Sequence, residues 1–295
     1  NYITVAADHG DPAILQPLGL PAPSSPDARP PLSLWPADVH VIGKDIIKFH
    51  AVYWPIMLHA AGLPLPRQIL THGWWQKDGH KLSKSTGNVV DPVAVIRDWG
   101  LDAFRYYVLR ELAIGPDGNW TDEGFQSRYN AELANGLGNL LNRAVNMLNK
   151  YRDGIVPAPS DELAPDALRA VENATQRLRQ NDLQGALVAT WDLVNRANLY
   201  VEQTQPFKLA KDPAQAARLD DVLYNLVECC RILAILLVPF LPDTSRRILE
   251  QLGVAAPAGS HVWPMAAWGG LRQGHKVAAP APLFPRRDLK PKPAA

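Results

Sequence analysis

Two kinds of periodicity follow one another along this chain, and their order constrains the fold more than any other feature. Between residues 35 and 75 a short apolar strand, a helix and a second apolar strand occur in succession. This spacing is typical of a βαβ unit, which requires a parallel sheet with its ligand site at the carboxyl ends of the strands. After Gly118 only helical periodicity remains. The order predicts an α/β part followed by an all-α part.

The α/β part is bounded by clear signals. The first strand, 39–42, ends at Gly43, and the helix "DIIKFHAVYWPIMLHAAG" begins at Asp45 and stops at Gly62. Pro55 is expected to kink this helix because it cannot donate a backbone hydrogen bond. The second strand lies within 67–75 and leads to a turn and a loop at 79–88.

The all-α part predicts a helical bundle. Helical periodicity covers 123–151, 162–179, 182–204, 214–238 and 241–252. The first of these segments carries an apolar stripe that we assign to the core, namely Leu133, Leu137, Leu140, Leu141, Ala144 and Leu148.

Composition excludes several classes of protein. The 295 residues allow two domains, and 47% are hydrophobic, as in a packed globular protein. There is no apolar run of about 18 residues and no basic-then-apolar leader, so neither a membrane partner nor secretion is expected. The only cysteines, Cys229 and Cys230, are adjacent within an apolar helix and are interpreted as core residues. A cytoplasmic location is the simplest expectation.

Charge is unevenly distributed. Residues 1–118 carry a net −1, residues 119–255 a net −3 and residues 256–295 a net +5. The first two regions are expected to be the domains, neither of them basic enough for non-specific nucleic-acid binding, and no DNA partner is expected. The Pro/Ala-rich basic tail, 256–295, is expected to be disordered. The chain also starts without Met inside a helical pattern, and we interpret it as a fragment.

The stretch "GHKLSKSTGN", 79–88, places two ammonium groups and two hydroxyls in one loop. Lys81, Lys84, Ser83 and Ser85 lie within it. A mobile loop of this kind suits a polyanion, since ammonium groups are strong partners for phosphate oxygens. The alternative is an ordinary solvated surface loop.

Further candidates follow the first strand. Gly43 allows close backbone approach, and the Asp45 carboxylate can accept hydroxyl protons, although Asp45 alternatively only complements a helix N-terminus. Ile46, His50 and Tyr53 share one face of the helix, at i, i+4 and i+7. Such a histidine is alternatively a structural residue.

Two further helix faces carry residues with a predicted role, one in the core and one in RNA contact. Phe49, Val52 and Ile56 lie on a second face of the first helix, which we assign to the core. Asn139 and Arg143 share a face, and an amide beside a guanidinium can read unstacked bases of an RNA loop. The alternative for this pair is an ordinary polar helix surface.

These residues together resemble a known family. "KLSKS" looks like the Lys-Met-Ser-Lys-Ser signature of class I aminoacyl-tRNA synthetases, with Leu82 in place of Met. More specific are the segments "VHVIGKDIIKFHAVYWPIML", "ILTHGWW", "GLDAFRYYVLRE" and "LANGLGNLLNR". With them the chain resembles the C-terminal half of bacterial-type methionyl-tRNA synthetases, from residue 1 to about 252.

The resemblance implies ATP-dependent attachment of methionine to its tRNA through methionyl-adenylate. It implies the C-terminal part of a Rossmann-type catalytic domain followed by a helical-bundle anticodon-binding domain. Lys84, assisted by Lys81, would contact the phosphates in the transition state. Ser83, Gly43 and Asp45 would join Lys84 in binding ATP, which enters with Mg²⁺.

The resemblance also assigns the remaining specificity residues. Ile46 and His50 match positions that line the methionine pocket. Asn139 and Arg143 match residues that read the CAU anticodon. Phe207, after "VEQTQP", stands where the family usually has a Trp on which a base stacks. Asp102 and Arg105 are interpreted as a structural i, i+3 pair in the family's stem-contact element.

The family's His-Ile-Gly-His element, connective insertion and zinc knuckle would lie upstream of Asn1. No metal site is therefore expected in this chain, and the chain alone is expected to be inactive. Two alternatives stay open. One is a non-catalytic tRNA-binding module derived from a synthetase. The other is a different class I synthetase, for leucine, isoleucine, valine or cysteine.

Overall fold

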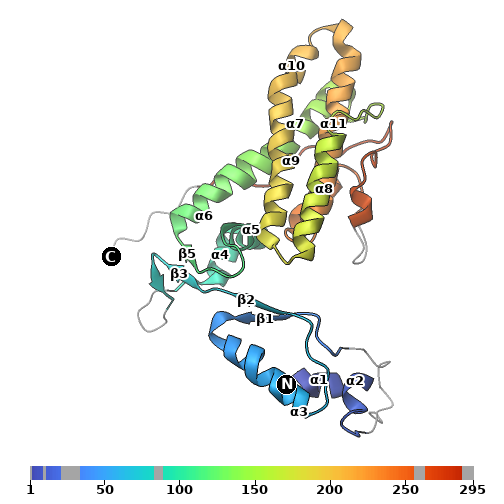
Figure 1. Ribbon diagram of the computed structural model, residues 1–295. Helices are drawn as coiled ribbons and strands as arrows, with labels where there is room; N and C mark the ends of the chain where they lie inside the picture. Colours follow the sequence, from blue (N-terminus) through green and yellow to red (C-terminus); the bar gives the residue numbers. More distant parts are fainter. Residues whose placement is uncertain (1, 9–10, 21–33, 83–88, 256–262, 288–295) are drawn as a thin grey trace. The chain divides into compact units, whose positions relative to one another are not determined.

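The computed structural model describes residues 2–8, 11–20, 34–82, 89–255 and 263–287. The chain divides into two compact units (Figure 1). The sheet unit comprises Asn1–Trp75 and Ile114–Gly118, and the helical unit comprises Gln76–Ala113 and Asn119–Ala295.

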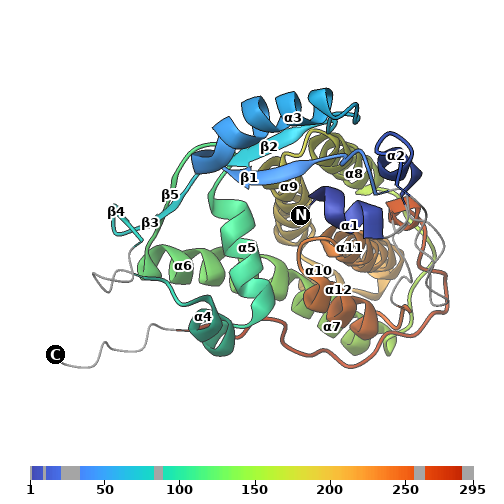
Figure 2. The same ribbon diagram turned by 90° about the horizontal axis from the view of Figure 1, so that it is seen from below.

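The sheet unit contains the predicted βαβ connection. Strands β1 (His40–Gly43) and β2 (Ile69–His72) pair in parallel, with His40 opposite Ile69 and Gly43 opposite His72. Helix α3 (Trp54–Ala60) connects them and lies alongside both strands (Figures 1 and 2). The carboxyl ends of β1 and β2 therefore meet at one edge, as parallel pairing requires.

The predicted helix from Asp45 to Gly62 is not regular. It opens with the 3₁₀ turn η1 (Lys44–Ile46) and a wide π turn, η2 (Phe49–Tyr53), before α3 begins at Trp54. Pro55 falls in the first turn of α3, where its missing N–H is tolerated. The change of helix type lies before Pro55, and the kink expected at this proline stays a prediction.

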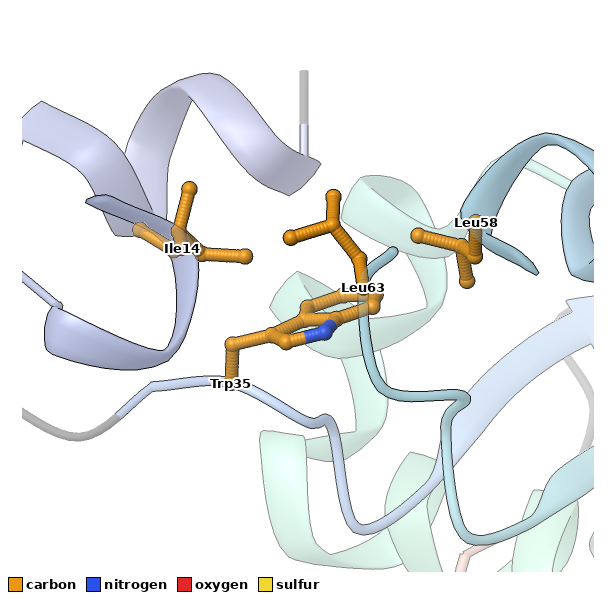
Figure 3. Packing of buried hydrophobic residues seen from close by; sticks show 5 residues of the cluster. Ile14, Trp35, Leu58 and Leu63 are labelled. Carbon is orange, nitrogen blue, oxygen red and sulfur yellow. The ribbon is translucent and has the colours of Figure 1, made fainter. Parts of the chain in front are cut away.

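The core of the sheet unit is small. It consists of Ala6 from α1 (Tyr2–Asp8), Ile14 from α2 (Pro12–Leu15), Trp35, Leu58 and Leu63 (Figure 3). The buried carboxylate of Asp11 fixes Trp35, because Asp11 Oδ2 accepts the backbone N–H of Trp35 at 2.6 Å.

The face of the first helix that we assigned to the core is exposed. Phe49, Val52 and Ile56 are 55%, 48% and 62% exposed. The assignment assumed α-helical rotation through residues that form a π turn, and in the described part of the chain these three side chains are about half exposed or more. The core prediction for these three residues is therefore wrong for this chain.

A small three-stranded sheet of order β4-β3-β5 follows β2, and within it β3 and β4 pair antiparallel. Strands β3 (Trp75–Lys77) and β4 (His80–Lys81) form a hairpin around Asp78 and Gly79, and β5 is Gly118–Trp120. Residues 83–88 lie outside the described residues. Helix α4 (Pro92–Trp99) then begins at the predicted Asp-Pro signal, with Asp91 as its N-cap.

The helical unit follows the predicted periodicity closely. Its main helices are α5 (Leu101–Glu111), α6 (Asp122–Arg128), α7 (Asn139–Arg152), α8 (Ala164–Arg179), α9 (Leu183–Thr204), α10 (Pro206–Leu209), α11 (Ala216–Leu237) and α12 (Pro242–Gln251), with a π segment η3 (Tyr129–Gly138) joining α6 to α7. Helix α11 is buried over most of its length. Every residue of the predicted stripe from Leu133 to Leu148 is buried.

The boundary at residue 118 does not separate the two units in space. Helices α4 and α5 precede this boundary but belong to the helical unit. Tyr106 of α5 lies against Trp191 of α9, with ring centroids 4.4 Å apart. These helices are amphipathic, and their apolar sides find the larger core.

Asp102 and Arg105 have a structural role but do not pair with each other. Asp102 Oδ2 accepts the backbone N–H of Thr244 at 2.6 Å, and Arg105 Nε donates to the carbonyl of Phe240 at 2.6 Å. Both side chains hold the connection between α11 and α12, so the predicted i, i+3 pair is wrong.

The C-terminal segment is ordered where the structure describes it. We call residues 263–287 the strap; it opens with the 3₁₀ turn η5 (Trp263–Ala266) and runs along α7 and α12 (Figure 2). Arg231 donates to the carbonyls of Met265 and Ala267, and Tyr129 Oη donates to that of Pro285. The prediction of disorder is wrong for these residues. None of the described helices is long and apolar enough to cross a membrane.

Candidate functional site

The turn after β1 presents a carboxylate at the carboxyl edge of the parallel pair. Asp45 is exposed and lies directly beyond Gly43. A Cβ placed on Gly43 would lie 2.5 Å from Asp45 Oδ1, so only glycine lets the carboxylate fold back over the strand end. Trp74 Nε1 donates to the same oxygen at 3.4 Å. An exposed carboxylate held at a strand end can accept ligand hydroxyls.

His50 is held by hydrogen bonds on both ring nitrogens. Its Nδ1 lies 3.1 Å from the carbonyl oxygen of Ile46 and its Nε2 lies 3.2 Å from Tyr2 Oη. Because a carbonyl only accepts, Nδ1 carries the proton, and in the neutral ring Nε2 accepts from the tyrosine hydroxyl. The His50 ring thus contacts the backbone of Ile46, and the shared pocket of the two side chains stays a prediction.

Rings that the sequence interpretation missed surround His50. Tyr2 lies 6.0 Å from His50 and 4.6 Å from His40, between ring centroids. Trp54 lies 5.9 Å from Tyr2 and 5.9 Å from Trp35. We call Tyr2, Trp35, His40, His50 and Trp54 the aromatic cluster. The spacing of four between Ile46, His50 and Trp54 was a signal for Trp54.

Tyr53 does not belong to this cluster. Its ring lies 5.8 Å from that of Phe49, and Lys48 Nζ lies 5.3 Å from its centroid. The π turn at 49–53 has more residues per turn than an α-helix, so the α-helical spacing that grouped Tyr53 with His50 does not apply there. The grouping of Tyr53 with His50 stays a prediction.

One member of the aromatic cluster, His40, is buried. His40 is 6% exposed, and its Nε2 has no hydrogen-bond partner among the described residues. Burial lowers the pKa of His40, and the nearby His50 lowers it further. A neutral aromatic wall is a favourable surface for an apolar or thioether side chain.

The structure describes only part of the segment that is predicted to contact the phosphates. Lys81, the first residue of "KLSKS", is also the last residue of β4, so the signature sequence begins at the end of the hairpin. Ser83 and Lys84 lie outside the described residues. Their assignment to ATP binding stays a prediction.

The candidate RNA-contact face lies on α7, α9 and α10. Asn139 is the first residue of α7 and Arg143 follows one turn later. The guanidinium of Arg143 bonds Glu202 of α9 at 2.7 Å, with side-chain exposures of 39% and 64%. Phe207 of α10 is 48% exposed, just beyond the left-handed turn at Gln205. Glu202 was not recognised from the sequence, because nothing local pairs it with Arg143.

No group of three or more His, Cys, Asp or Glu among the described residues could hold a metal ion.

Comparison with known families defines the class of protein. Residues 33–145 match the family model "tRNA synthetases class I (M)". Residues 154–288 match the model "Anticodon binding domain of methionyl tRNA ligase". A parallel β1–β2 pair, the "KLSKS" sequence and this helical unit therefore follow one another along the chain as in class I aminoacyl-tRNA synthetases.

Similar proteins narrow the class. The chain is 45% identical over 262 residues to a methionine–tRNA ligase of Caldanaerobacter subterraneus, covering 87% of this chain and 41% of that protein. It is 46% identical to the methionine–tRNA ligase of Bacillus subtilis, covering 87% of this chain and 40% of that protein. The chain belongs to the methionyl-tRNA synthetase family.

Solved structures give the same result. Mycobacterium tuberculosis methionyl-tRNA synthetase in complex with methionyl-adenylate aligns with a TM-score of 0.79 at 40% identity, covering 89% of this chain and 53% of that chain. Its apo form aligns with a TM-score of 0.76 at 36% identity, covering 94% of this chain and 54% of that chain. The chain thus spans about two fifths of the length of the curated relatives and about half of these structures.

Proposed function

We propose that this chain is the C-terminal part of a methionine–tRNA ligase. Such a ligase joins the methionine carboxylate to the α-phosphate of ATP with release of pyrophosphate, and then passes the methionyl group to the 3′ end of its tRNA with release of AMP. The observation that carries the proposal is the arrangement in the sheet unit. One turn after β1 presents the Asp45 carboxylate, and the helix that follows presents His50 inside the aromatic cluster. A nucleotide and an apolar amino-acid side chain can therefore bind next to each other.

Each part of this site has a distinct role. Asp45 accepts the ribose hydroxyls, and Gly43 lets the nucleotide approach the strand end. Ile46, His50 and the rings around them surround the thioether of methionine, since sulfur–aromatic contacts are favourable by about 0.3–1.5 kcal/mol. Support comes from the relative from Mycobacterium tuberculosis, whose structure holds methionyl-adenylate.

Lys84, with Lys81 and Ser83, contacts the ATP phosphates. Negative charge builds up on these phosphates in the transition state of adenylate formation. A loop ammonium that meets them at that point lowers the barrier without tightening ground-state binding. ATP enters as the Mg²⁺ complex.

The helical unit binds the anticodon loop of the methionine tRNA. Asn139 and Arg143 offer an amide and a guanidinium for the edges of unstacked bases, and Phe207 offers an exposed ring for stacking. The match of residues 154–288 to an anticodon-binding family supports this role for the helical unit and includes Phe207, whereas Asn139 and Arg143 precede the matched range.

The proposal is tested with Lys84→Ala in the complete synthetase polypeptide. We expect adenylate formation to slow by about 2–4 kcal/mol in activation free energy, the scale for losing one such donor, with methionine affinity unchanged. The assay is ATP–pyrophosphate exchange. Unchanged exchange in the variant would refute the role of Lys84.

The 295-residue chain alone is expected not to activate methionine, because its parallel sheet has only the strands β1 and β2 among the described residues. Strong exchange by the purified chain would contradict this. If the complete polypeptide also lacks exchange while the chain binds tRNA, the chain is a non-catalytic tRNA-binding module.

A further inference from the structure

The segment Ile114–Gly118 docks against the carboxyl end of β2. A Cβ on Gly73 would lie 2.0 Å from the carbonyl oxygen of Pro116 and 2.8 Å from the backbone nitrogen of Asp117. Backbone atoms cannot move aside as a flexible side chain can, so any other residue at position 73 would push the segment away. The backbone N–H of Gly118 also donates to the carbonyl of Trp74 at 2.9 Å.

This docking places the Asp117 carboxylate between two elements of the nucleotide site. Lys44 Nζ lies 2.7 Å from both carboxylate oxygens. The backbone N–H of Trp74 donates to Asp117 Oδ1 at 2.8 Å. Lys44 Nζ also lies 4.5 Å from the centroid of the Trp74 ring. One carboxylate therefore holds the ends of β1 and β2 together.

Two neighbours of Asp117, namely Lys44 and Trp74, also contact or adjoin Asp45. Lys44 is the neighbour of Asp45 in the turn η1, and the Trp74 indole donates to Asp45 Oδ1 at 3.4 Å. Movement of Asp117 would release both the backbone of the turn and the indole that orients its carboxylate.

The Lys44–Asp117 pair is less exposed than another ion pair of the same unit. The pair Arg67–Asp38 has side-chain exposures of 70% and 79%, whereas Lys44 and Asp117 have 39% and 31%. Isolated exposed pairs contribute little to stability. Asp117 accepts from a backbone N–H as well as from an ammonium group, and Lys44, followed by that N–H, holds the pKa of Asp117 below its ordinary value. The carboxylate is thus ionised at neutral pH.

We propose that Asp117 is a positioning residue for ATP, which holds Lys44 and Trp74 so that the Asp45 carboxylate meets the ribose hydroxyls. This inference rests on the proposed function of Asp45. Asp117 itself acts through these neighbours and is not assigned to contact the substrate.

The first test needs no catalysis and uses the 295-residue chain. The Trp74 indole N–H signal is identified in an ¹⁵N-tryptophan spectrum by its loss in Trp74→Phe. We expect Asp117→Ala, Lys44→Met and Gly73→Ala each to shift this signal, and the matched control Asp38→Ala to leave it in place. An unmoved Trp74 signal in folded Asp117→Ala would overturn the proposal.

The second test uses ATP–pyrophosphate exchange by the complete synthetase polypeptide. Asp117→Ala should raise the KM for ATP about tenfold, the scale of one weakened charge-assisted hydrogen bond, and leave the KM for methionine unchanged. Asp117→Glu, which can still pair with Lys44, should recover most of this loss. Equal changes in both KM values would contradict positioning. Absence of exchange in the unmodified polypeptide would instead refute the proposed function, while the indole spectrum still decides the role of Asp117.

Discussion

At the scale of single residues, the predicted RNA contact of Arg143 is affected by its ion pair with Glu202. Its guanidinium is engaged by Glu202 at 2.7 Å, so an RNA base competes with a carboxylate for the same donor. Arg143→Ala should weaken tRNA binding by about 1–3 kcal/mol and reduce discrimination against a changed anticodon. Glu202→Gln should strengthen binding, because it frees the guanidinium and removes a negative charge.

The measurement is a titration of the chain with the methionine tRNA and with an anticodon mutant. Arg246→Ala is the matched control, since Arg246 is also exposed and ion-paired, but with Asp243 and Glu250 of its own helix. Equal weakening by both arginine variants would assign Arg143 to general charge attraction instead of base reading.

At Phe207, a substitution is expected to maintain or strengthen tRNA binding. Its ring is 48% exposed on the short helix α10, so a larger ring fits without displacing core residues. Phe207→Trp should maintain or strengthen tRNA binding because stacking area grows, whereas Phe207→Ala should lose about 1–3 kcal/mol. The same titration measures both variants. Unchanged affinity in Phe207→Ala would show that no base stacks at this position.

Sequence spacing predicted residue contacts only within one helical turn. The His50 ring bonds the backbone carbonyl of Ile46 one turn earlier, whereas the spacing to Tyr53 crosses the π turn, where the rotation per residue differs from that of an α-helix. Tyr2 and His40 reach His50 from other elements, and local periodicity carries no information about such distant approaches.

At the scale of elements, the strap depends on one buried ion pair. Glu228 and Arg231 of α11 have side-chain exposures of 0% and 5%. Glu228 accepts from Arg231 and from the backbone N–H groups of Gly269, Gly270 and Leu271. The three backbone N–H groups of the strap therefore find this carboxylate only while the strap is docked, whereas the bond from Arg231 lies within α11.

Glu228→Gln should lower the free energy of unfolding of the helical unit by about 3–5 kcal/mol, because Arg231 stays buried without its counter-ion. Urea denaturation followed by circular dichroism measures the change. Glu250→Gln is the control, since Glu250 also pairs with an arginine but in an exposed position, with a side-chain exposure of 56%. A similar small loss in both variants would contradict the structural role of the buried pair.

The strap also shows why composition misled the prediction of disorder. A Pro-rich segment has few N–H donors, yet every residue keeps a carbonyl acceptor. Arg231, Arg247 and Tyr129 supply the donors from distant helices. Disorder was predicted from the Pro-rich composition of the segment, whereas its order depends on donor side chains elsewhere in the chain.

At the scale of the whole molecule, element order was predictable and spatial grouping was not. The βαβ unit and the helices after Gly118 follow from local patterns that each segment carries by itself. The allocation of α4 and α5 to the helical unit depends on which core their apolar faces meet, and that is decided between segments far apart in sequence.

The solubility of the chain should be set by the sheet unit, whose core is small and whose first helix exposes an apolar face. Ile56 and Leu58 are two residues apart, but Ile56 is 62% exposed and Leu58 is 1% exposed. Ile56→Glu should raise the concentration at which the chain precipitates and change stability by less than about 0.5 kcal/mol, because it breaks an exposed apolar patch without touching the core. Leu58→Ala should cost about 2–5 kcal/mol, because it leaves a cavity beside Trp35 and Leu63. Sedimentation after concentration and urea denaturation measure the two effects. If Ile56→Glu destabilised the sheet unit as much as Leu58→Ala, the face containing Ile56 would be part of a core, and its exposure would be refuted.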